Sequence, residues 1–139
     1  MSISEWLSRH VDRRRSSRFR PLDLVAYYWT GAYPEPNRVR EIGLYGARIA
    51  APEPFYLGTV VEIVFEDRAA GQKSGEAFPH ACAYGRVLRR VTDGFCVEFV
   101  FDDTTSRRAF RRFVEKLVRR NANETNTGID PIMRGTGAD

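Results

Sequence analysis

Hydrophobic and polar residues alternate along much of this chain, which predicts a sheet with one face in a core. In TVVEIVFE, residues 59–66, Val61, Ile63 and Phe65 fall on one face. Because successive strand side chains point to opposite faces, a period of two is typical of half-buried antiparallel strands. The pattern predicts six strands, at residues 22–29, 38–42, 47–50, 59–66, 81–91 and 95–101.

Helical spacing of hydrophobic residues appears before the first of these strands and again after the last. SEWLSRHV, residues 4–11, predicts a short N-terminal helix that Ser4 can cap. Residues 102–120 predict a C-terminal amphipathic helix, whose apolar face consists of Ala109, Phe110, Phe113, Val114, Leu117 and Val118. Its other face is rich in Arg and Lys, which we interpret as a solvated face. Strands without intervening helices, followed by one helix, predict a mostly β fold, either a small six-stranded antiparallel β-barrel or a sandwich.

Length and composition limit the chain to one domain. Of its 139 residues, 42% are hydrophobic, which is enough for one core. We expect this domain to span residues 1–120. Residues 121–139 are rich in Asn, Gly and Thr and have little to bury, so they are predicted to be a disordered tail.

The net charge of +4 favours an anionic partner, such as a nucleotide, a nucleic acid or an acidic protein. Positive charge is concentrated in residues 12–21, which contain Arg13, Arg14, Arg15, Arg18 and Arg20. The two cysteines and two histidines lack metal-ligand spacing, and we find no pairing of nucleophile and base, so we expect no metal site, no catalytic residues and no enzyme. No apolar run approaches the roughly 20 residues that cross a bilayer, which predicts a cytoplasmic protein without membrane insertion.

Two glycines interrupt the strand-like run REIGLYGARI, residues 40–49. Gly43 and Gly46 lie three positions apart, which predicts a tight turn or a bulge where another segment comes close. A barrel corner with positive φ would explain them without any ligand.

The order of these features resembles the PilZ domain family. That family has an Arg-x-x-x-Arg stretch before its first barrel strand, which Arg14 and Arg18 match in full. Its second motif, [Asp/Asn]-x-Ser-x-x-Gly, falls on residues 41–46 and matches at Gly46, while Glu41 replaces the acid or amide and Gly43 replaces the serine. The resemblance covers residues 12–118 and implies a six-stranded barrel.

What the resemblance implies is a receptor for cyclic di-GMP, a bacterial second messenger, bound as a monomer or as a dimer and without a further cofactor. The implied binding residues are Arg14, Arg15, Arg18, Glu41, Gly43 and Gly46. Arginine suits this ligand because its planar fork can bond to guanine or phosphate and can also stack on a base. Ligand binding would order the arginine segment and reposition a surface for an unidentified protein partner.

Two alternatives stay open at this point. In the first, the protein is a degenerate PilZ-like adaptor that contacts other proteins and no longer binds nucleotide, because Gly43 has no hydroxyl to offer. In the second, which we favour less, a small basic barrel binds single-stranded nucleic acid through stacking on Tyr27, Tyr28, Trp29 or Tyr45.

Overall fold

The computed structural model describes residues 18–52, 55–71 and 75–137, with side chains described as far as residue 123. The predicted helix at residues 4–11 and the arginines Arg14 and Arg15 therefore lie outside the described residues. The strands are β1 (Arg18–Phe19), β2 (Leu24–Tyr28), β3 (Asn37–Gly43), β4 (Gly46–Ala50), β5 (Val60–Asp67), β6 (His80–Val91) and β7 (Gly94–Val100). A 3-10 turn, η2 (Arg68–Ala70), follows β5, and the helix α2 (Thr104–Gly137) follows β7.

Six of these strands form a closed antiparallel barrel, as predicted. Their order is β3-β2-β5-β6-β7-β4, and pairing between β3 and β4 closes the ring. All six predicted strands are present, each within two residues of its expected ends. The short strand β1 was not predicted. It pairs with the end of β3 at Ile42 and Gly43, on the same edge that β2 uses at Asn37 and Arg38.

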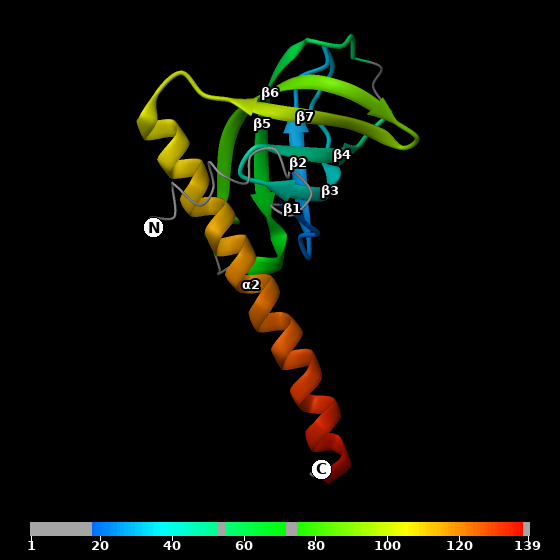
Figure 1. Cartoon of the computed structure of the whole chain (residues 1–139), viewed down its shortest axis with the longest axis vertical. Helices are drawn as coiled ribbons and strands as arrows, with labels where there is room; N and C mark the ends of the chain where they lie inside the picture. The colour runs from blue at the N-terminus through cyan, green and yellow to red at the C-terminus, as the bar shows by residue number, and fades with distance from the viewer. Residues whose placement is uncertain (1–17, 53–54, 72–74, 138–139) are drawn as a thin grey trace.

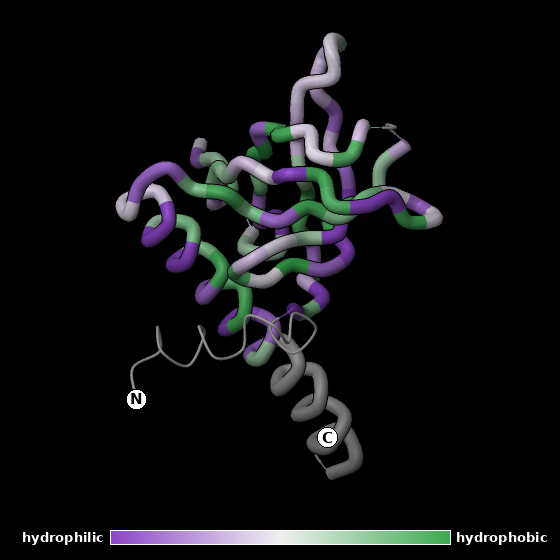
Figure 2. Tube along the Cα trace, turned by 45° about the horizontal axis from the view of Figure 1, so that its top comes forward, coloured by the Kyte–Doolittle hydropathy of each residue, from purple (hydrophilic) through white to green (hydrophobic). Residues whose placement is uncertain are grey.

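The alternation of the sequence becomes the inside and outside of the barrel. Val61, Ile63 and Phe65 are buried, whereas Glu62 between them is exposed. The same alternation of hydrophobic and hydrophilic residues is visible along the strands in Figure 2. Two sets of aromatic rings fill the interior, one around Phe95 with Tyr28 and Phe55, the other around Phe65 and Phe99.

Helix α2 covers one side of the barrel (Figure 1). The residues that it buries are Phe110, Phe113, Val114 and Leu117. Phe110 contacts Phe99 with 4.7 Å between ring centroids and Phe65 with 5.8 Å, so the helix extends the second aromatic set. Ala109 and Val118, which were predicted on this face, are exposed. The stripe of α2 that packs on the barrel is therefore narrower than the stripe of apolar residues in the sequence.

Polar contacts attach α2 to the barrel near its middle. Arg120 Nε lies 3.1 Å from Oδ2 of Asp67, a buried carboxylate at the end of β5. Asn121 Nδ2 donates a 2.6 Å hydrogen bond to the carbonyl of Arg20, between β1 and β2. Helix α2 continues from there to Gly137. No helix in the described residues is long and apolar enough to cross a membrane.

Candidate functional site

Arg18 and the two glycines of the 40–49 segment meet on the barrel surface. Pairing of β1 with β3 places Arg18 directly opposite Gly43. The guanidinium of Arg18 then reaches across β3, and its Nη2 lies 3.1 Å from the position that a Cβ on Gly46 would occupy. Residues far apart in the sequence thus form one small surface, in which the Arg18 guanidinium lies against the backbone of the two glycines.

This surface faces away from the core. Ile42 and Ala47 pair across the β3–β4 hairpin and are fully buried. Their neighbours Gly43 and Gly46 therefore point outward, because strand positions alternate. Glu41, two residues before Gly43, lies on the same outer face, opposite Arg48 of β4. The structure brings together every sequence-predicted site residue that it describes: Arg18, Glu41, Gly43 and Gly46.

Gly46 is required by a close approach of backbone. A Cβ at this position would overlap the carbonyl oxygen of Val97 in the neighbouring strand β7. The main-chain N–H of Phe99 also donates a 2.8 Å hydrogen bond to the carbonyl of Tyr45, which holds the hairpin turn against β7. In the described residues the positive-φ glycines are Gly31, Gly58, Gly71 and Gly75. A barrel corner with positive φ is therefore the wrong explanation for Gly43 and Gly46.

Arg48 belongs to this surface and was missed at the sequence level. Its Nη2 lies 3.3 Å from Asp93, which Arg40 also contacts at 2.6 Å. Desolvation alone would raise the pKa of Asp93, but the hydrogen bond from Arg48 and the charge of Arg40 outweigh it, so the pKa is lowered. The Nε of Arg48 is buried and has no hydrogen-bond partner in the described part of the chain. A buried N–H without an acceptor costs free energy, so an acceptor oxygen at this point would be stabilising. Arg48 lies two residues after Gly46, so the alternation of a strand places both on the outer face, and this spacing was the signal in the sequence.

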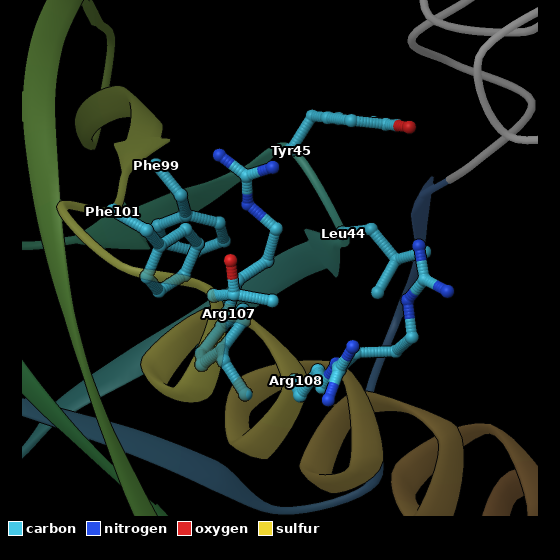
Figure 3. Close-up of a pocket in the computed structure, with 9 residues that line it drawn as sticks. Leu44, Tyr45, Phe99, Phe101, Arg107 and Arg108 are labelled. Carbon is cyan, nitrogen blue, oxygen red and sulfur yellow. The ribbon is translucent and has the colours of Figure 1, made fainter. Parts of the chain in front are cut away.

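A cavity adjoins the surface on the other side of the hairpin turn. It has a volume of about 500 Å³ and lies between that turn, the end of β7 and the first turns of α2 (Figure 3). Its lining consists of Leu44, Tyr45, Phe99, Phe101, Thr104, Arg107, Arg108, Phe110 and Arg111. Leu44 and Tyr45 are the two residues between Gly43 and Gly46, so one turn separates the cavity from the surface under Arg18.

The aromatic residues proposed for stacking do not form one platform. Tyr27, Tyr28 and Trp29 line a different cavity together with Phe55 and Val60, and it shares no residue with the one beside Tyr45. Tyr27 is also engaged, because its hydroxyl donates to Glu66 at 3.3 Å and accepts from Arg68 at 2.6 Å. This arrangement does not favour binding of one extended single strand. Among the residues that the structure describes, no group of His, Cys, Asp and Glu could hold a metal ion.

Comparison with known families bears directly on this surface. The PilZ domain model matches residues 12–116, most of the chain. The chain belongs to the PilZ domain family. PilZ domains are binding and adaptor domains, and the family is associated with cyclic di-GMP and with protein partners. Arg18 and Gly46, which match the two PilZ motifs in the sequence, are neighbours in this PilZ chain, with Arg18 Nη2 3.1 Å from the position that a Cβ on Gly46 would occupy.

Solved structures agree on the fold of this PilZ domain. The Bacillus subtilis inhibitor of motility, MotI/DgrA, superposes with a TM-score of 0.54 at 12% identity, over 77% of this chain and 50% of that one. The present chain thus spans about half the length of that protein. The uncharacterized Legionella protein Lpg0364 superposes with a TM-score of 0.50 at 10% identity, over 76% of this chain and 97% of that one. No curated protein matches the sequence.

Proposed function

We propose that this PilZ protein is a cyclic di-GMP receptor whose ligand lies on the outer face of β3 and β4, beside Arg18. The observation that carries the proposal is the position of the Arg18 guanidinium over Gly46. Gly43 and Gly46 are buried, and the Arg18 guanidinium lies directly against the backbone of Gly46, so the ligand would contact the free edge of the guanidinium. The arginine fork can then bond to guanine O6 and N7 or to a phosphate oxygen.

Acceptor chemistry for the opposite edge of the base is present on the same face. Glu41 can accept hydrogen bonds from guanine N1 and N2, and its extra methylene lengthens its reach relative to the family's aspartate. Gly43 supplies no hydroxyl, and one lost neutral hydrogen bond costs about 0.5–1.5 kcal/mol. That cost weakens binding without abolishing it. Arg14 and Arg15, which precede β1 in the sequence, would complete the arginine side of the site around a monomeric or dimeric ligand.

Signalling in this proposal follows from the ordering of the arginine segment. A ligand shifts a conformational equilibrium only through contacts that differ between the two states. The contacts of Arg14 and Arg15 with bound ligand would supply that difference and present a changed surface to a protein partner. A cytoplasmic location belongs to the same proposal, as does the absence of an enzymatic role.

Isothermal titration calorimetry with cyclic di-GMP, GMP and cyclic di-AMP tests the ligand. We expect cyclic di-GMP to bind and the other two to bind far more weakly. Arg18→Ala should raise Kd by about tenfold or more, since a hydrogen bond to a charged group contributes about 1.5–3 kcal/mol. Arg18→Lys should bind poorly as well, because an ammonium keeps the charge but loses the fork. Arg38→Ala is the matched control, because Arg38 is an exposed arginine at the far end of β3, the strand with which Arg18 pairs at Gly43.

The degenerate-adaptor alternative rests on Glu41 and Gly43, which depart from the family motif. Gly43 does not have positive φ, so a serine can be introduced there without backbone strain of that kind. If the wild type fails to bind at high micromolar ligand and Glu41→Asp with Gly43→Ser restores binding, the protein is such an adaptor. If neither binds, and a single-stranded RNA binds at low salt and dissociates at high salt, the arginines serve nucleic acid and the receptor proposal is wrong.

A further inference from the structure

Two arginines of α2, Arg107 and Arg108, line the cavity beside Tyr45. Arg107 and Arg108 are exposed, and neither guanidinium has an ion-pair partner among the described residues. Arg120 of the same helix, in contrast, pairs with Asp67. Figure 3 shows the Arg107 side chain extending from α2 toward Tyr45, on the rim of the cavity.

These two arginines occupy an unfavourable place for helix stability. The helix begins at Thr104, and its first turn contains no acidic residue. The N-terminal end of a helix carries partial positive charge, so cations there are repelled by the macrodipole. Arg107 and Arg108 also lie four residues before Arg111 and Arg112, which places like charges side by side. Asp102 and Asp103 precede the helix, and Asp103 accepts hydrogen bonds from Ser106, but neither carboxylate forms an ion pair with Arg107 or Arg108 among the described residues. Like charges grouped in this way break local consistency, and such breaks are typical of functional sites.

The cavity has the composition of a small-ligand site. Its floor is formed by aromatic rings, with Phe99 and Phe110 packed at 4.7 Å between centroids, and Leu44 adds a further apolar wall. The volume of about 500 Å³ falls within the range of about 300–1,000 Å³ that is common for such sites. An apolar floor with a cationic rim suits a ligand that combines a flat ring with a phosphate.

The cavity adjoins the surface beside Arg18, which points to one ligand for both. Leu44 and Tyr45 line the cavity, while the glycines on either side of them lie under Arg18. The hydrogen bond from the Phe99 N–H to the Tyr45 carbonyl holds this turn against β7, and the turn forms the boundary between the two regions. A cyclic dinucleotide has two bases and two phosphates, and half of it can lie on each side of one two-residue turn.

We propose that Arg107 and Arg108 of α2 bind the half of the cyclic dinucleotide that extends past the Leu44–Tyr45 turn, with one of its phosphates at their guanidinium groups. This inference rests on the proposed function and adds a second wall, from α2, to the site under Arg18. Helix α2 is then part of the nucleotide site as well as a cover for the barrel.

The test compares two double variants of the full chain by titration with cyclic di-GMP at low and at physiological salt. Arg107→Ala with Arg108→Ala removes the proposed phosphate contacts. Arg112→Ala with Arg119→Ala removes the same charge from exposed positions of α2 that do not line the cavity. We expect the first pair to raise Kd by about tenfold or more and to weaken its salt dependence, and the second pair to leave Kd within about twofold of the wild type.

Thermal unfolding of the same variants separates binding from folding. Because Arg107 and Arg108 are exposed and oppose the macrodipole, their removal should not lower the melting temperature. If both double variants bind alike while Arg18→Ala loses binding, the inference about α2 is wrong and the receptor proposal stands. If the wild type does not bind cyclic di-GMP at all, the receptor proposal fails, and this inference fails with it.

Discussion

Replacing Gly46 with alanine tests why this position is glycine. The added methyl group would overlap the carbonyl oxygen of Val97, a backbone atom that cannot rotate away. Relief requires β4 to move from β7, although the two are held in register from Gly46↔Glu98 to Ala50↔Gly94. Overpacking of this kind costs about 1–3 kcal/mol. Alanine also lowers the conformational entropy of the unfolded chain, which stabilises the folded state by about 0.4–1 kcal/mol.

The middle of these two ranges gives an expected net loss for Gly46→Ala of about 1–2 kcal/mol. For a chain of 139 residues this corresponds to a fall in melting temperature of roughly 3–8 °C, measured by circular dichroism and checked by urea denaturation. Cyclic di-GMP binding should weaken too, because the methyl group also crowds Nη2 of Arg18 at 3.1 Å.

Gly43→Ala is the matched control for this prediction. Gly43 lies in the same hairpin, on the same face and also without positive φ. Gly43 belongs to β3, which does not pair with β7, so the Val97 carbonyl that crowds Gly46 is not expected to crowd it, and we expect a smaller loss there. Equal losses at both positions would indicate a general intolerance of the hairpin rather than the approach of the Val97 carbonyl. Unchanged stability of Gly46→Ala would refute the close-approach explanation outright.

Three further changes test how α2 is held. Phe110→Ala should cost about 3–5 kcal/mol in urea unfolding, because a fully packed ring is removed from the aromatic set between helix and barrel. Cutting the chain after Arg120 removes the 2.6 Å hydrogen bond of Asn121 and should cost about 0.5–1.5 kcal/mol, whereas a cut three residues later should leave the melting temperature unchanged. Hydrogen bonds from the main chain and side chain of Ser106 lower the pKa of Asp103 at the start of α2. The Asp103 carboxylate therefore stabilises the fold above the unfolded-state pKa of about 3.9, and this stabilisation is lost as pH falls through the lower folded-state pKa. Asp103→Asn should make the free energy of unfolding less dependent on pH in that range, measured by acid unfolding.

Local patterns in the sequence were enough to predict the parts of this protein. Alternation predicted the six barrel strands because burial of one face imposes a period of two on any strand. Helical spacing predicted the packed face of α2, at Phe110, Phe113 and Leu117. The arginine segment and the glycine pair predicted where a ligand site should be sought, and the resemblance to PilZ domains that they carry agrees with the family match.

Tertiary structure decided how these parts meet, because contacts between residues distant in sequence depend on strand register and closure. The unpredicted strand β1 is two residues long and has no periodicity to detect, yet its pairing with Gly43 sets Arg18 over Gly46. The sequence likewise left the reason for Gly46 open between positive φ and close approach, since the Val97 carbonyl comes from a strand paired by the closed barrel. The cavity beside Tyr45 exists only because α2 packs across the end of β7, which places Arg107 and Arg108 next to a turn more than 60 residues earlier.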